Sequence, residues 1–216
     1  MSASLPGELL EVFERSVNGE LVTIDERGHP LAWAVSPALR SDVGCIEVGP
    51  MAAHDPHVAL LLCDDERMVL IQGTAQGVRV RPERVYAWPG ASPDAEPLLY
   101  DWHVEEVRSA HNEEPEVGHA APEGGPTASW DDLLDELPAA AALGFMGPDG
   151  FPFAVRVPVR ADRDACVVRI ASDPVGAPIE PGPACLSARS VQVLGDLVEE
   201  HGAWVLQPHR LSRRNG

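Results

Sequence analysis

Two histidines come closest to the residue types and spacing of a metal site. His54 and His57 flank Asp55 and Pro56 in the segment His-Asp-Pro-His. Imidazole and carboxylate groups are common zinc ligands. However, Pro56 disrupts the helical geometry that would bring the two imidazoles together, and no third ligand is evident. We therefore expect this segment to be the polar start of a helix.

The four cysteines are the other candidates for metal or redox chemistry. They are Cys45, Cys63, Cys166 and Cys185, and none belongs to a Cys-x-x-Cys pair. We therefore expect neither a zinc cluster nor a disulfide framework. Cys45, Cys63 and Cys166 lie in apolar runs typical of strands, which predicts buried free thiols.

The remaining side chains offer little for covalent catalysis. All 16 basic residues are arginines, which excludes a lysine Schiff base, a lysine nucleophile and a P-loop lysine. The motifs Gly-x-Ser-x-Gly, His-Glu-x-x-His and Gly-x-Gly-x-x-Gly are absent. Paired acids at 64–66 and 131–132 fit a turn and a helix N-terminus. We identify no general acid or base.

Charge and composition narrow the class of protein. The net charge of −18 argues against binding of nucleic acids or of an anionic membrane surface. No apolar run reaches the roughly 18 residues of a membrane-spanning helix. Acidic residues stand near the N-terminus where a signal peptide would carry bases, so we expect a cytoplasmic protein. With 44% hydrophobic residues, the chain can bury a substantial core.

An internal repeat determines how the candidate residues are distributed along the chain. A shift of 122 residues aligns Gly28 with Gly150, Pro30 with Pro152, Ala32 with Ala154, Cys63 with Cys185, Val69 with Val191 and Gly73 with Gly195. After four extra residues in the second copy, Pro82 aligns with Pro208 and Arg84 with Arg210. The chain therefore reads as two copies, at 1–89 and 129–216.

Each copy predicts a short helix followed by short strands. The helices are 5–13 and 130–137, the second with a capping box at Ser129 and Asp132. The strands of the first copy are expected at 20–25, 31–38, 44–49, 58–63, 67–76 and 77–81. Those of the second are expected at 141–146, 152–159, 165–171, 183–188, 190–198 and 203–207. Such units form small barrels or sandwiches. The acidic, proline-rich segment 90–128 reads as a linker or surface excursion, with one apolar stretch at 98–107.

The order of motifs in the first copy carries a family resemblance. The motifs are Gly28-His29-Pro30, the run 55–60 (Asp-Pro-His-Val-Ala-Leu), the run 69–73, and Pro82-Glu83-Arg84-Val85 followed by Trp88. Together they resemble the pyridoxamine 5′-phosphate oxidase-like, FMN-binding split-barrel family. The resemblance implies a mainly β protein of two tandem six-stranded Greek-key split barrels with short helices, paired within the chain as a pseudo-dimer. It also leaves pairing of whole chains as a homodimer open.

The resemblance implies a flavin groove between the barrels, with residues from both. The family's phosphate-binding arginine is replaced by Trp33 in the first copy and by Val155 in the second. Trp88 matches a flavin-contact position, and Arg160, with Arg156 on the same strand face, could replace the phosphate clamp. The alternatives are that both arginines cover apolar surface, that Trp33 is a core or interface residue, and that Trp88 packs a barrel end.

Two function classes follow from the resemblance. The first is an FMN-dependent oxidoreductase that transfers hydride through flavin N5 to an unknown small-molecule substrate, with the deazaflavin F420 as a variant cofactor. The second is a non-catalytic binding or interaction module, with no cofactor or with haem. A pyridoxamine phosphate oxidase proper is disfavoured, because the Arg-His pair for its substrate is missing after Trp88.

Overall fold

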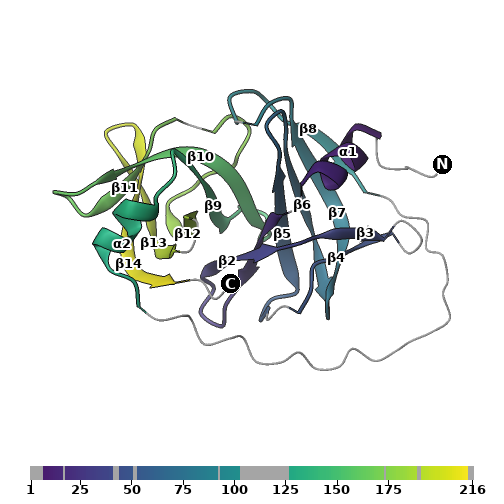
Figure 1. The fold of residues 1–216 in the computed structure, drawn as a ribbon, viewed down its shortest axis with the longest axis horizontal. Coiled ribbons are helices and arrows are strands. Elements are labelled where there is room, and N and C mark those ends of the chain that lie inside the picture. The colour runs from purple at the N-terminus through teal and green to yellow at the C-terminus, as the bar shows by residue number, and fades with distance from the viewer. Residues whose placement is uncertain are drawn as a thin grey trace.

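Strands dominate the computed structural model and form two sheets that pack against each other (Figure 1). It describes residues 7–16, 18–40, 44–50, 53–91, 93–102, 127–172, 174–188 and 191–213. Within these ranges, no helix has the length and apolar character needed to cross a membrane.

The first part of the chain forms one curled sheet and a short helix. Its elements are α1 (Gly7–Arg15), β1 (Gly19–Ile24), β2 (Pro30–Val35), β3 (Ala38–Arg40), β4 (Cys45–Glu47), β5 (His57–Cys63), β6 (Met68–Gln76), β7 (Arg79–Trp88) and β8 (Leu98–Asp101). The strand order is β2-β1-β5-β6-β7-β4-β3, with β8 added against β7. The apolar stretch predicted within the linker therefore begins as a strand of this sheet, while 103–107 lies outside the described residues.

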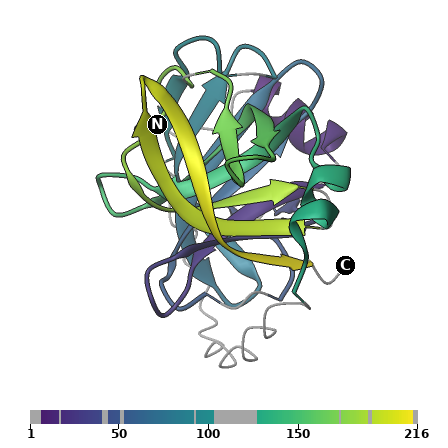
Figure 2. The same ribbon diagram turned by 90° about the vertical axis from the view of Figure 1, so that its left-hand side faces the viewer.

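The second part forms a closed six-stranded barrel. Its elements are α2 (Trp130–Glu136), β9 (Ala140–Met146), β10 (Pro152–Asp162), β11 (Val167–Ile170), β12 (Gly182–Ala188), β13 (Val191–Glu200) and β14 (Ala203–Arg213). The order around the barrel is β10-β11-β14-β13-β12-β9. The predicted capping box is present, since the Ser129 side chain accepts from the Asp132 N–H and Asp132 accepts from Ser129. Figure 2 shows the barrel from its outer side.

The two parts use one pattern of strand pairing. Val22 pairs with Ala32 between β1 and β2, and Gly144 pairs with Ala154 between β9 and β10. β6 and β13 each contain a register shift, at Gln72/Gly73 and at Leu194/Gly195. In each sheet the shifted glycine faces a proline of the next strand. The pairing therefore repeats with the offsets expected from the sequence in these strands.

One strand explains why only the second sheet closes. β10 pairs with β9 through its first part and with β11 through its last four residues. The corresponding segment of the first part is split into β2 and β3 around Ser36 and Pro37. Pro37 has no backbone N–H to donate to a ladder, but β10 runs without interruption through its own Pro158, so a proline alone does not explain the break. Of the two six-stranded barrels that the sequence predicted, the second part forms a closed barrel, whereas the first part forms a curled sheet.

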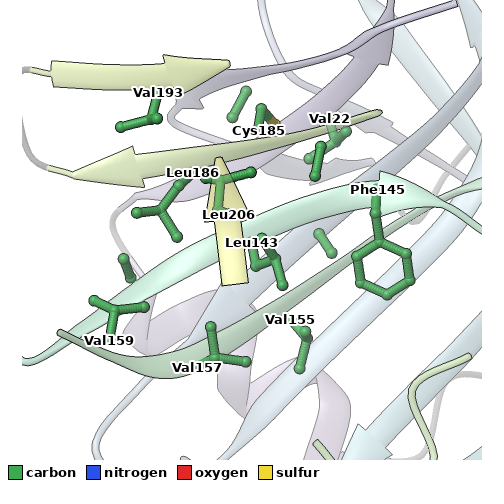
Figure 3. Close-up of a cluster of buried hydrophobic side chains, with 14 of the residues drawn as sticks. Val22, Leu143, Phe145, Val155, Val157, Val159, Cys185, Leu186, Val193 and Leu206 are labelled. Atoms are coloured by element: carbon green, nitrogen blue, oxygen red, sulfur yellow. The ribbon is translucent and has the colours of Figure 1, made fainter. Parts of the chain in front are cut away.

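Residues from both parts share a core. β10 packs across β1, β5 and β6, and reciprocally β2 packs across β9, β12 and β13. Figure 3 shows Val22 of β1 beside Cys185 and among side chains of the closed barrel. At Gly144, a Cβ would lie 2.9 Å from a Val22 methyl and 2.8 Å from the Cys185 sulfur. Neighbouring side chains thus fill the space that this glycine leaves.

The structure corrects three sequence expectations. Cys63 is not the counterpart of Cys185, because Gly144 pairs with Cys185 whereas its counterpart Val22 pairs with Ala59. Cys166 is exposed in a turn and has a φ of 53°, instead of lying buried in a strand. The residues after Pro56 begin strand β5 and not a helix, since its pairing with β6 stabilises an extended backbone.

Thiol reactivity should separate the four cysteines. Cys45 and Cys185 are buried, Cys63 is half-buried, and desolvation raises the pKa of Cys63 to about 12, with Arg156 opposing the shift. Because the thiolate is the reactive form, iodoacetamide should alkylate Cys166 at least roughly tenfold faster than the other three. Mass spectrometry of the native protein measures this, and the fast phase should vanish in Cys166→Ser. Equal labelling of Cys63 and Cys166 would contradict the described burial.

Candidate functional site

Trp88 lies at the junction of the two sheets. It is the last residue of β7, it is 1% exposed, and its indole N–H donates to the Val175 carbonyl oxygen at 3.1 Å. Its ring lies 6.3 Å from that of Phe153 on β10, nearly perpendicular, and 6.3 Å from that of Tyr86. Both the ring and the polar edge of this tryptophan are therefore already engaged by the protein.

The aromatic cluster around Trp88 is continuous across the two parts. Tyr86 of β7 and Phe153 of β10 have centroids 5.2 Å apart in an edge-to-face arrangement. Phe153 in turn lies 5.4 Å from Phe145 of β9. Edge-to-face and tilted contacts of this kind favour association beyond simple burial. The cluster thus holds β7 against the barrel.

Arg156 lies beside the same junction but faces solvent. Its backbone N–H donates to the Met68 sulfur at 3.2 Å, and its exposed guanidinium interacts with the Cys63 thiol. Met68 pairs with Cys63 on one side and with Trp88 on the other. Trp88 and Arg156 therefore approach the same methionine, Trp88 from within its own sheet and Arg156 from the opposite sheet.

Arg160 continues the outer face of β10. Alternation along the strand places it on the same side as Arg156, while Val155, Val157 and Val159 point into the barrel (Figure 3). Arg160 pairs directly with Arg169 of β11. Arg169 donates twice to one oxygen of Asp162, at 3.0 and 3.1 Å, whereas no partner is described for the exposed Arg160.

Asp162 compensates part of this positive charge. Hydrogen bonds from the Ala165 N–H and then from Arg169 hold the pKa of Asp162 below its usual range. Like charges directly opposite one another in a ladder are unfavourable. The Arg169–Asp162 ion pair reduces the repulsion between the two arginines. Of these two arginines, Arg160 is the one whose guanidinium is open to a ligand.

Trp33 is placed elsewhere. Its indole N–H donates to the Thr23 hydroxyl at 2.9 Å, and its half-buried ring packs on the core cluster of the first sheet alone. Trp88 belongs to the shared cluster instead. Of the four candidate site residues, Trp88 and Arg156 are thus brought close together, Arg160 follows along the strand, and Trp33 lies in a different cluster.

A second group at the junction was not anticipated from the sequence. Arg84 of β7 forms an ion pair with Asp149 in the β9–β10 turn, and its guanidinium lies 4.8 Å from the Phe151 ring centre. His57 lies on the same ring, with centroids 4.3 Å apart. The residues 147–150 (Gly-Pro-Asp-Gly) are typical of a turn, but this pattern carries no information about a contact with the other sheet.

The ionisation of Asp149 is set by its contacts. Burial disfavours the Asp149 carboxylate, but hydrogen bonds from Arg84 and from the Phe151 N–H outweigh it and keep the pKa of Asp149 below its usual range. The ring Nδ1 of His57 lies 2.7 Å from an Asp55 oxygen. No cluster of three or more metal-ligating side chains occurs in the described parts of the chain.

Gln72 is a buried polar residue at the junction. Its side-chain N–H donates to the Pro152 carbonyl at 2.9 Å, and Gln192 similarly donates to the Ala32 carbonyl at 3.2 Å from the other part. The two bonds run in opposite directions between the sheets. The junction is therefore fastened by polar contacts on both sides as well as by the shared core.

No family model matches the chain, and no curated protein sequence is significantly similar to it.

Proposed function

We propose that the chain is a tandem pair of split barrels joined as an intrachain pseudo-dimer, and that it serves as a non-catalytic small-molecule-binding module. The tandem arrangement is supported by the repeated strand pairing and by the reciprocal packing of β10 and β2 on the opposite sheets. The resemblance to the flavin-binding split barrels supplies the expectation that ligands meet such a pair at the junction.

The burial of Trp88 favours the binding module over the flavin-dependent oxidoreductase. A flavin ring needs a flat apolar wall with room beside it and donors aimed at its polar edge. Trp88 is 1% exposed, Phe153 covers it from the opposite sheet, and its N–H is bonded to Val175. The wall that the resemblance assigns to the isoalloxazine is thus occupied by the protein's own side chains, which disfavours stacking there.

FMN binding with hydride transfer is the second candidate, favoured by the arginine face of β10. Arg156 and Arg160 are both exposed on this face in a protein of net charge −18. Guanidinium groups bind phosphate well, because their paired donors match its oxygens. The same face would hold a phosphate whether or not a flavin ring follows it.

Titration with FMN, F420, haemin and riboflavin tests the proposal. The purified protein should be colourless. The absorption spectrum of each compound should be the same with and without the protein. FMN should raise the melting temperature no more than an equal concentration of inorganic phosphate does, because only the phosphate has a partner.

Two arginine variants test whether phosphate binds specifically at the arginine face of β10. Arg160→Gln should remove the phosphate-dependent rise in melting temperature, whereas Arg27→Gln, at an exposed turn of the first part, should retain it. Saturable FMN binding with an altered flavin spectrum, lost in Arg160→Gln, would replace the proposed module with the flavoprotein candidate. A Soret shift on adding haemin would likewise overturn the cofactor-free form of the proposal.

A further inference from the structure

A cavity opens at one end of the closed barrel. It has a volume of about 290 Å³ and lies between the β13–β14 hairpin and the segment that leads into β12. The hairpin is formed by the long yellow strands in Figure 2. The lining residues are Pro174, Ala177, Ile179, Glu199, Gly202 and Trp204. Mouths of β-barrels are common places for small-ligand sites, and this volume is near the lower limit for one.

The strand register explains how two of these side chains reach the cavity. Leu197 pairs with Leu206 in the barrel core, and two residues further along the same ladder Glu199 pairs with Trp204. Because strand side chains alternate, Glu199 and Trp204 continue the inward face of the barrel past its last core layer. The core face thus ends in a carboxylate and an indole that stand side by side.

The chemistry of the lining is asymmetric. Pro174, Ala177 and Ile179 supply an apolar wall, Trp204 supplies a half-buried aromatic face, and Glu199 supplies a carboxylate. Within the described ranges, Glu199 forms no ion pair or hydrogen bond, whereas its neighbour Glu200 accepts from Gln207 at 3.2 Å. An aromatic face next to an uncompensated carboxylate favours a cation with an apolar surface.

We propose that this cavity binds a small organic ammonium ion, with the cationic group between the Trp204 ring and the Glu199 carboxylate. The net charge of −18 attracts cations toward the surface in general. The indole and the apolar side chains then favour an alkylated ammonium over a hydrated metal ion, because they offer dispersion and cation–π contact, and Glu199 is the one described lining residue with a side-chain oxygen. Strand alternation places Trp204 on the inner face of the barrel, whereas Arg160 lies on its outer face, which would take anions.

Choline and propylammonium are the probes, and 3,3-dimethyl-1-butanol is the neutral isostere of choline. Isothermal titration of the full chain at physiological salt should show at least one of the two cations binding at least tenfold more tightly than the alcohol. Indole N–H signals in ¹H–¹⁵N spectra should assign the perturbation to Trp204, with Trp204→Phe identifying its resonance. Failure of both cations to exceed the alcohol would overturn the proposal.

Matched variants separate the site from the general negative charge. Glu199→Gln and Trp204→Leu should each weaken binding of the cation at least tenfold. Glu200→Gln removes the same charge from the opposite face of the hairpin and should change the affinity less than twofold. Equal weakening by Glu199→Gln and Glu200→Gln would instead mean nonspecific attraction and would refute the site.

Discussion

Replacing Trp88 with alanine is expected to lower the free energy of unfolding by about 4 kcal/mol, as for other fully buried tryptophans. The substitution removes a side chain that is 1% exposed and leaves a cavity between β7 and the barrel. It also leaves the Val175 carbonyl without its indole donor. Urea denaturation followed by circular dichroism measures the loss, since the midpoint falls while the slope should remain unchanged.

The effect should extend to both sheets. Trp88 contacts Phe153 of β10, and both belong to one core cluster that contains side chains of the two parts. Hydrogen exchange should therefore show reduced amide protection in β10 as well as in β6 and β7. Loss of protection confined to the first sheet would contradict a shared core and would weaken the case for an intrachain pair.

Two control variants test whether the loss of stability in Trp88→Ala comes from the buried ring. Trp88→Phe retains an aromatic ring and should cost distinctly less than alanine, although the bond to Val175 is lost in both. Leu98→Ala removes a large apolar side chain that is 61% exposed on β8 and should change the stability by less than about 0.5 kcal/mol. A loss at Trp88 no greater than at Leu98 would contradict the described packing.

Local sequence signals predicted most strands and failed at specific positions. Alternating apolar runs between turn signals located the hairpins, because both signals act over a few residues. The closing strands were expected to end at 81 and 207, immediately before Pro82 and Pro208, but β7 and β14 continue to Trp88 and Arg213. Each proline sits at a register shift, where the ladder does not need its missing N–H.

The sequence alignment of the two copies was wrong at one strand, because it could not detect the strand register. Identical letters aligned Cys63 with Cys185, but the residue that occupies the Cys185 position in the first sheet is Ala59. The connections before and after this strand differ in length between the two parts, and the differences compensate. A sparse alignment cannot detect such compensation, because the register depends on which face of each strand is buried and on the geometry of the turns.

At the candidate site too, the sequence predicted which residues come together but not how they are buried. The family resemblance placed Trp88 and the arginines of β10 on opposite copies, and Trp88 and Arg156 do meet at Met68 across the sheets. Burial of Trp88 depends on Phe153 and Val175, which are distant in sequence and belong to the other part. No pattern around Trp88 itself carries that information.

Replacing Gly73 with alanine is expected to lower the free energy of unfolding by about 3 kcal/mol, the upper part of the usual range for forced overpacking. A Cβ at this position would lie 2.1 Å from the Arg81 carbonyl oxygen and 3.0 Å from the Pro82 Cα. Both obstacles are backbone atoms of the neighbouring strand, so no rotation of a side chain can relieve the contact. The register shift between β6 and β7 would have to open.

The second part contains a twin of this site, which makes the prediction a test of the repeat. At Gly195 a Cβ would lie 2.2 Å from the Gln207 carbonyl oxygen and 3.0 Å from the Pro208 Cα. Gly195→Ala should therefore cost as much as Gly73→Ala in urea denaturation, whereas Thr74→Ala, one residue along β6, adds no atom and should cost less than about 1 kcal/mol. A large loss at one glycine with none at the other would mean that the two register shifts are not structural equivalents. Equal losses, with protection falling in both sheets for either variant, would tie the paired geometry to one cooperative fold, as expected if two copies of one barrel pack as partners within the chain.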